Sequence, residues 1–368
     1  MSADKPHLVV AGGGTGGHLF PGVAVAEAFL KRAPEGKVTF VGTARGIEAR
    51  VIPGLGYPLE LMEVPTLKGK GAFGALKGAL QLPKSGFAAR KLIKQLCPDV
   101  VVSVGGYAAG PVTMLASRMG VKTALMEQNS IPGLTNRTLG RVVDHAFLTF
   151  EQSATHFEGA CSYSIPGNPV RESFLTMRSR FRYEGPQEDG PFRILIIGGS
   201  GGAGSFNSEI PKWLRSMGPQ AARLEVRHQA GRGRADEARP GYEGFQGTVE
   251  VTEFIDDMAA AYRWCDLMIC RAGASTIAEV LTLGLPAIYV PFPHAADDHQ
   301  RANALSVVEA GAGVMLDDQE LASDRARSLL LGFLNNPRAL RNLAEKAHEL
   351  GRPEAAEKIV DKIFEMIR

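Results

Sequence analysis

The sequence predicts an α/β protein made of two Rossmann-like domains, each with a doubly wound parallel sheet, that face each other across a cleft. The first observation is length: 368 residues exceed what one hydrophobic core usually serves, so two domains of roughly 170 residues are expected. The second is a repeated pattern, an apolar run followed by a glycine loop, at 8–18 and again at 193–204. Each copy is typical of a strand, a glycine turn and the start of a helix.

The first glycine loop has the spacing G-x-G-x-x-G at Gly12, Gly14 and Gly17, directly after the apolar residues 8–11. Glycines at this spacing let backbone N–H groups approach a phosphate at a helix N-terminus. The helix is expected from Pro21 to about Ala33, because proline suits a first helical turn. An anion site is therefore expected at this loop.

A dinucleotide site would also need an acidic side chain at the end of the next strand, where it binds a ribose. The strand expected at 38–41 is followed by no carboxylate before Glu48. The second loop, 198–204, is followed by a strand at 224–227 that also lacks a terminal acid. Both loops therefore indicate phosphate binding without NAD.

Further apolar runs predict the remaining strands, at 100–104, 123–126, 145–150, 267–270 and 287–290. The glycine turn 105–106 and the polar run 127–129 each follow one of these strands. Open α/β sheets bind their ligands at such carboxyl ends. The polar run 178–191 is interpreted as an interdomain linker, and 320–350 and 353–367 as amphipathic helices.

Composition excludes several function classes. The 41 basic and 39 acidic residues give a net charge of +2, too balanced for nucleic-acid binding over the whole surface. No signal peptide is evident, and no apolar run approaches the roughly 18 residues of a membrane span. Free thiols and no metal site are expected, because the four cysteines lack ligand spacing: Cys97, Cys161, Cys265 and Cys270.

The segment 64–98 contains no Asp or Glu but seven Lys or Arg residues. One interpretation is a surface that contacts anionic lipid, with lysines on phosphates and apolar side chains in the interface. The other is a core-facing helix with a solvated basic rim. The candidate contact residues are Lys68, Lys70, Lys77, Phe73, Leu76 and Leu80.

Eight motifs, in order along nearly the whole chain, resemble those of the MurG family of glycosyltransferases. They are GGTGGH (13–18), GGY (105–107), EQN (127–129), GNPVR (167–171), GGS (198–200), TEFIDDM (252–258), CRAGAST with Glu279 (270–279) and PFPHAADDHQ (291–300). The resemblance implies a GT-B fold and an inverting β-1,4 transfer of GlcNAc. The donor would be UDP-GlcNAc, and the acceptor the 4-hydroxyl of MurNAc-pentapeptide-diphosphoryl-undecaprenol (lipid I), giving lipid II for peptidoglycan.

The resemblance also implies the domain arrangement and the location. Residues 1–168 would form the acceptor and membrane domain, 169–191 the linker and 192–352 the UDP-GlcNAc-binding domain, with the helix 353–368 returning to the first domain. The protein would be peripheral, on the cytoplasmic face of the plasma membrane, and would contact anionic lipid of the inner leaflet. Other cell-wall enzymes are further candidate partners. No cofactor is expected.

The site residues follow from the same resemblance. On the donor side, the uracil would contact the backbone of Ile255, and the ribose would contact Glu279. The diphosphate would contact Ser200, Arg171 and the helix start at Ala274, Ser275 and Thr276. GlcNAc hydroxyls would meet Asn129 and Gln300. The reacting end would be lined by Thr15, Gly16, Gly17 and His18.

Inversion at the sugar C1 calls for one direct displacement assisted by a base. His18 is the first candidate, because imidazole titrates near neutral pH, and Glu127 is the alternative. For His18 the other role is donation to the acceptor diphosphate, and for Glu127 it is to anchor a loop. Two other functions are compatible with parts of the pattern: a UDP-GlcNAc 2-epimerase, and a dinucleotide oxidoreductase, which the missing ribose acids disfavour.

Overall fold

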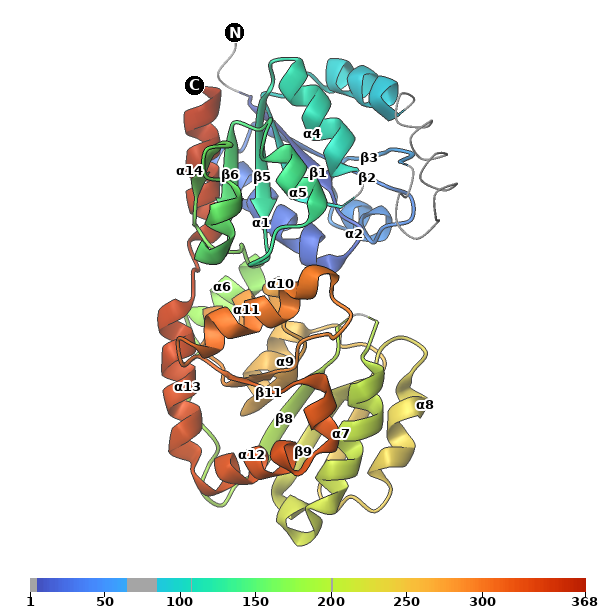
Figure 1. The fold of residues 1–368 in the computed structure, drawn as a ribbon, viewed down its shortest axis with the longest axis vertical. Coiled ribbons are helices and arrows are strands. Elements are labelled where there is room, and N and C mark those ends of the chain that lie inside the picture. The colour runs from blue at the N-terminus through green and yellow to red at the C-terminus, as the bar shows by residue number, and fades with distance from the viewer. Residues whose placement is uncertain (1–4, 65–84, 107, 200) are drawn as a thin grey trace. The chain divides into compact units, whose positions relative to one another are not determined.

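The computed structural model describes residues 5–64, 85–106, 108–199 and 201–368 (Figure 1). The chain divides into two compact units, 1–172 together with 353–368, and 173–352. The candidate lipid-contact residues Lys68, Lys70, Phe73, Leu76, Lys77 and Leu80 lie outside the described residues, as does Ser200.

Unit 1 contains a seven-stranded parallel sheet in the order β3-β2-β1-β4-β5-β6-β7. Strands β1 and β4 are wholly buried, which explains their continuous apolar runs. The strands are β1 (His7–Gly12), β2 (Lys37–Gly42), β3 (Leu59–Leu61), β4 (Val100–Gly105), β5 (Lys122–Glu127), β6 (His145–Leu148) and β7 (Ser162–Ser164). The helices are α1 (Gly16–Arg32), α2 (Glu48–Gly54), α4 (Ala109–Arg118), α5 (Leu134–Leu139), η1 (Glu151–His156) and α14 (Ala355–Ile367), and 85–96 is also helical.

Helix α1 begins at Gly16, five residues before the start predicted at Pro21. The chain leaves β1 through glycines with positive φ at 12, 13 and 14 and turns directly into the helix after Thr15. Pro21 therefore lies inside the helix, where its missing N–H removes one backbone hydrogen bond. The predicted helix start was wrong because the glycine loop ends at Thr15, and Pro21 does not mark the first helical turn.

Helix α14, from the end of the chain, packs on α1 in unit 1. The rings of Phe29 and Phe364 stack at 5.3 Å between centroids, and Arg32 pairs with Asp361 and lies over the Phe364 ring. The last residues of the chain therefore complete the core of the first unit.

Unit 2 contains a six-stranded parallel sheet in the order β10-β9-β8-β11-β12-β13. The strands are β8 (Phe192–Ile197), β9 (Leu224–Gln229), β10 (Thr248–Thr252), β11 (Leu267–Cys270), β12 (Ala287–Tyr289) and β13 (Val314–Met315). The helices are α6 (Glu172–Arg178), α7 (Gly204–Ser216), η2 (Gly218–Arg223), α8 (Ala235–Ala238), η3 (Arg239–Tyr242), α9 (Met258–Trp264), α10 (Ala274–Leu283), η4 (Ala296–Asp298), α11 (His299–Val308), η5 (Asp318–Ala322), α12 (Asp324–Asn335) and α13 (Pro337–Leu350).

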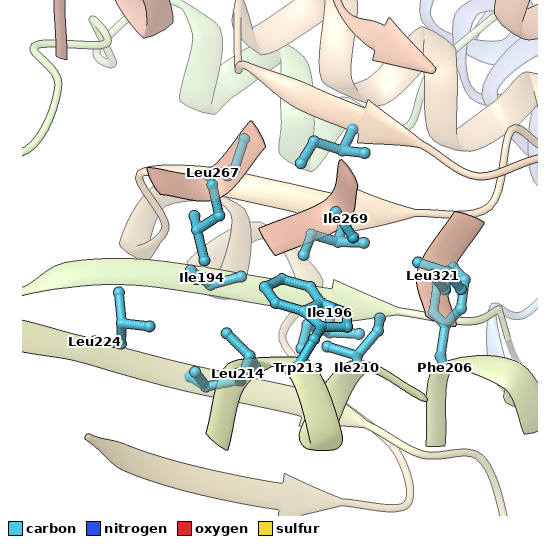
Figure 2. Close-up of a cluster of buried hydrophobic side chains, with 14 of the residues drawn as sticks. Ile194, Ile196, Phe206, Ile210, Trp213, Leu214, Leu224, Leu267, Ile269 and Leu321 are labelled. Carbon is cyan, nitrogen blue, oxygen red and sulfur yellow. The ribbon is translucent and has the colours of Figure 1, made fainter. Parts of the chain in front are cut away.

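The core of unit 2 lies between its sheet and α7 (Figure 2). Ile194 and Ile196 of β8 and Ile269 of β11 are at most 1% exposed and face Phe206 and Ile210 of the helix. Full burial of each such side chain contributes about 1.5–3 kcal/mol. This packing fixes the start of α7, and with it the glycine loop that precedes the helix.

The segment 173–191, which falls within the predicted linker, is part of unit 2 and is hydrogen-bonded to the rest of it. The Tyr183 hydroxyl donates to the Asp266 carbonyl at 2.8 Å, and Arg341 donates to the Glu184 carbonyl at 2.9 Å. In the described part of the chain, no helix combines the length and apolarity needed to cross a bilayer.

Candidate active site

Two glycine turns of unit 1 interlock at the carboxyl ends of β1 and β4. The Gly13 N–H donates to the Gly105 carbonyl at 3.0 Å. A Cβ on Gly12 would lie 1.9 Å from the Gly105 oxygen, and one on Gly106 would lie 2.5 Å from the Gly13 oxygen. Only glycine permits so close an approach of two backbones. The turns predicted at 12–17 and 105–106 therefore form one surface where the strand order reverses, the usual ligand position in such sheets.

His18 lies on this surface, in the first turn of α1. Its Nδ1 is 3.3 Å from Oε1 of Gln128, and the Gln128 amide Nε2 donates to the Val104 carbonyl at 3.1 Å. Because that donation orients the amide, its oxygen faces the imidazole, and Nδ1 is the ring atom that carries the proton. In the neutral ring, Nε2 then holds the lone pair that a general base needs. Sequence reasoning placed Gln128 at this sheet edge but gave it no role.

Glu127, the other candidate base, is 2% exposed at the end of β5. Its Oε1 accepts the Asn129 N–H at 2.9 Å, and its Oε2 accepts from the Asn136 side chain at 2.9 Å. Asn136 also donates to the Met126 carbonyl. The carboxyl group therefore anchors the loop between β5 and α5, and this geometry favours the anchoring role over proton abstraction from a substrate.

Glu127 should make stability depend on pH. Burial raises its pKa from 4.5 to about 7. Because the folded state favours the protonated acid, this contribution is complete below pH 4.5 and is lost as pH rises through 7. Relative to Glu127→Gln, which stays neutral, the wild-type chain should lose about 3 kcal/mol of unfolding free energy across this window. Denaturation curves of both proteins from pH 4.5 to 8 measure the difference; parallel pH profiles would contradict it.

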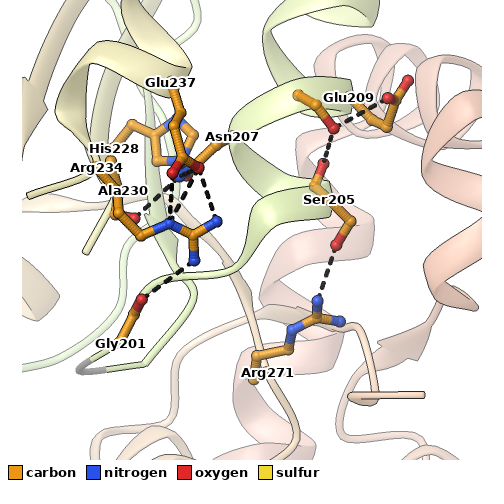
Figure 3. A network of polar contacts seen from close by, with 10 residues as sticks. Gly201, Ser205, Asn207, Glu209, His228, Ala230, Arg234, Glu237 and Arg271 are labelled. Atoms are coloured by element: carbon orange, nitrogen blue, oxygen red, sulfur yellow. Dashed lines mark hydrogen bonds and ion pairs between the residues drawn. The ribbon is translucent and has the colours of Figure 1, made fainter. Parts of the chain in front are cut away.

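The glycine loop of unit 2 is also packed against its neighbouring strand. A Cβ on Gly202 would lie 1.9 Å from the Ala230 oxygen. Two side chains support the loop by donating to its carbonyl oxygens: Gln229 to Gly199 and Arg234 to Gly201, each at 3.3 Å. Figure 3 shows that Arg234, directly before α8, reaches the Gly201 carbonyl while its guanidinium also donates to the carboxylate of Glu237.

Arg271, at the end of β11, ties the start of α7 to the sheet (Figure 3). It donates to the Ser205 hydroxyl at 2.8 Å and pairs with Asp318, while its guanidinium lies 4.4 Å from the centroid of the Phe206 ring. The residue is only 9% exposed. It therefore acts within the unit to hold the loop and helix start, a role that sequence reasoning did not assign.

Glu279 lies on α10, half-buried, one turn beyond Ala274, Ser275 and Thr276 at the helix start. The hydroxyl of the buried Tyr262 donates to its Oε2 at 3.0 Å. The carboxylate is thereby held in one orientation beside a helix N-terminus that attracts anions.

Two further predicted donor-side residues lie in loops or helix starts of unit 2. Ile255 lies between β10 and α9. The cap of α9 is Asp257, whose carboxylate accepts the Ala260 N–H at 2.9 Å. Gln300, in the first turn of α11, accepts the Phe292 N–H at 3.0 Å through its Oε1.

The remaining predicted residues lie in unit 1. Thr15, Gly16 and Gly17 form the start of α1 beside His18. Asn129 follows β5. Arg171 lies over the ring of Phe20, 4.7 Å from its centroid. Within the described ranges, no three His, Cys, Asp or Glu side chains group as metal ligands.

Comparisons with known proteins cover both units. Models of the glycosyltransferase family 28 N-terminal and C-terminal domains match residues 8–148 and 193–359. The chain is 45% identical over 362 residues to a protein of Anaeromyxobacter sp. (strain K), covering 98% of this chain and 93% of the relative. That relative is named UDP-N-acetylglucosamine--N-acetylmuramyl-(pentapeptide) pyrophosphoryl-undecaprenol N-acetylglucosamine transferase.

Solved structures give the same picture. The crystal structure of Acinetobacter baumannii MurG is 31% identical, with a TM-score of 0.77 over 98% of this chain and 100% of that one. The Neisseria meningitidis UDP-GlcNAc 2-epimerase, 13% identical with a TM-score of 0.68 over 98% and 100% of the two chains, shares the fold. The predicted fold class, two doubly wound parallel-sheet domains of the GT-B type, is confirmed.

Proposed function

Since this chain belongs to glycosyltransferase family 28, we propose that it performs the reaction for which its curated relatives are named. It is a UDP-GlcNAc-dependent hexosyltransferase that moves GlcNAc to the 4-hydroxyl of MurNAc-pentapeptide-diphosphoryl-undecaprenol. The product is lipid II of peptidoglycan synthesis. The observation that carries this assignment is 45% identity over 98% of the chain, which includes both units.

In the proposed mechanism, the acceptor hydroxyl binds at the surface of unit 1 formed by the glycine turns. His18 Nε2 takes the hydroxyl proton as the oxygen attacks C1 of GlcNAc and the bond from C1 to the UDP oxygen breaks. The tautomer set by Gln128 supports this role. Thr15, Gly16 and Gly17 position the acceptor, and Asn129 contacts the sugar.

On the donor side, the leaving UDP is an anion that needs electrostatic stabilisation. We assign this to Ser200, to Arg171 and to the start of α10 at Ala274, Ser275 and Thr276, whose dipole favours an anion by about 0.3–1 kcal/mol at an exposed site. Glu279 binds the ribose hydroxyls, and the Ile255 backbone the uracil. Because the Gln300 oxygen already accepts from Phe292, its amide nitrogen is the group proposed to meet GlcNAc. No metal or cofactor takes part in the proposal.

The acceptor carries a long lipid chain, which supports a peripheral location on the cytoplasmic face of the plasma membrane. The acid-free segment 64–98 supplies the basic and apolar side chains for contact with anionic lipid. We also propose other cell-wall enzymes as partners, since the lipid substrate must pass from one enzyme to the next.

The proposal is tested with the acceptor lipid in vesicles that contain or lack anionic lipid. The wild-type chain should form UDP and the disaccharide lipid, faster on anionic vesicles, and a Phe73→Ser, Leu76→Ser, Leu80→Ser variant should lose vesicle binding while keeping donor KM. Unchanged vesicle binding of the variant would refute the lipid contact. With UDP-GlcNAc alone, formation of UDP-ManNAc without transfer would instead establish the 2-epimerase function.

A further inference from the structure

A buried carboxylate lies beneath the first glycine loop. Glu48, at the start of α2, is 1% exposed. Its Oε2 accepts the Gly14 N–H at 2.7 Å, and its Oε1 accepts the Thr43 N–H at 2.9 Å and the Thr43 hydroxyl at 3.2 Å. One side chain therefore joins the loop after β1 to the loop after β2.

Three glycines make room for this carboxylate. A Cβ on Gly13 would lie 2.6 Å from its Oε2, one on Gly46 would lie 2.0 Å from the same atom, and one on Gly42 would lie 2.4 Å from its Cγ. Gly42 and Gly46 are not among the positive-φ glycines, so space for Glu48, and not backbone conformation, accounts for glycine there. The missing side chains of these three glycines therefore leave the space that the Glu48 carboxylate occupies.

The two glycine loops, alike in sequence, are held by side chains of opposite hydrogen-bonding type: donors in unit 2 and an acceptor in unit 1. In unit 2, Gln229 and Arg234 donate to the carbonyl oxygens of the loop. In unit 1, the supporting group is an acceptor with a negative charge, and it takes the Gly14 N–H that a phosphate would otherwise approach. A carboxylate–amide hydrogen bond is also stronger than one between neutral groups, so it holds the loop firmly.

We propose that Glu48 is a positioning residue for the transfer reaction. It holds the loop that carries Thr15 to His18 in the shape that the acceptor and the base require, and it keeps an external phosphate away from Gly14. The inference rests on the proposed function, which assigns the acceptor to this surface. It follows that acceptor use depends on Glu48, whereas binding of UDP-GlcNAc to unit 2 does not.

Glu48→Gln tests this role because it preserves shape and removes the charge. A glutamine can accept through only one atom, so one of the two N–H groups at Gly14 and Thr43 faces an NH₂ group. The matched control is Asp144→Asn: Asp144 accepts the N–H and the hydroxyl of Thr123, at 2.8 and 3.1 Å, near the opposite, amino end of the sheet. Each substitution removes a carboxylate that accepts the N–H and the hydroxyl of a threonine, but only Glu48 also contacts the glycine loop.

Two measurements are made on the full chain. Hydrogen–deuterium exchange of peptides covering 12–18 should speed up at least about tenfold in Glu48→Gln and stay unchanged in Asp144→Asn. The kcat/KM for the lipid acceptor should fall at least about tenfold in Glu48→Gln, with KM for UDP-GlcNAc within about twofold. Glu48→Ala should lose more activity and regain part of it in formate, which replaces the missing carboxylate, but not in formamide.

The role of Glu48 is overturned if exchange at 12–18 stays at the wild-type rate, or if it rises while acceptor kcat/KM is unaffected. Equal recovery with formate and formamide would likewise exclude a requirement for the negative charge. A wild-type chain that releases no UDP with the acceptor present would refute the proposed function itself. An active wild type with an equally active Glu48→Gln variant would refute only the role of Glu48.

Discussion

Replacing His18 with alanine should lower kcat by about 10²–10⁴-fold while KM for UDP-GlcNAc stays within about twofold. The expected loss is large because the imidazole is the proposed general base, and a positioned base typically contributes about 10²–10⁴-fold to the rate. Gln128 directs its oxygen at Nδ1, so Nε2 is the acceptor of the incoming proton. The donor should be unaffected because its proposed ligands, apart from Arg171 and Asn129, belong to unit 2. Initial rates at varied donor, with saturating acceptor, give both constants.

Two controls separate a base from a structural residue. Gln128→Leu keeps the imidazole but removes the acceptor that fixes its tautomer, so kcat should fall less than in His18→Ala. Glu127→Gln keeps the loop anchor nearly isosteric, and kcat should stay within about tenfold of wild type. A His18→Ala enzyme with more than about a third of the wild-type kcat, together with a hundredfold loss in Glu127→Gln, would transfer the role to Glu127.

The interior of each sheet could be predicted from the sequence because fully buried parallel strands read as continuous apolar runs. β1, β4, β8 and β11 were predicted within one or two residues. The edge strands 59–61, 162–164 and 314–315 were missed, since each is two or three residues long and partly exposed. Such strands are defined by their neighbour's hydrogen bonds, which leave no periodic signal in the sequence.

The glycine loops were predictable for a related reason, because their spacing reflects backbone approaches that only glycine allows. What fills the space around them was not. Glu48 was noted only as an acid too late in the chain to bind a ribose, yet it contacts Gly14, 34 residues away. Gln128 and Asn136 were likewise given no role, because the groups that they contact, His18 and Glu127, are brought to them only by the fold.

Glu279→Ala should raise KM for UDP-GlcNAc by about 10–100-fold, which corresponds to the roughly 1.5–3 kcal/mol of a hydrogen bond to a charged group. Tyr262 holds the carboxylate through Oε2, and the proposed ribose contact uses the group so oriented. Tyr262→Phe keeps the ring packed against Phe174 but removes this donor, so it should raise KM only a few-fold. A donor KM near the wild-type value in Glu279→Ala would remove this residue from the ribose site.

A donor lacking the ribose 2′-hydroxyl makes the assignment specific. If Glu279 accepts from the ribose, the wild-type enzyme should discriminate against the 2′-deoxy donor, and Glu279→Ala should bind both donors almost equally. The effects of the substitution and of the missing hydroxyl should then fall well short of additive, because each removes the same hydrogen bond. Fully additive losses would mean that Glu279 supports α10 or the loop that carries Ile255 instead, since a structural defect would weaken the binding of both donors by the same factor.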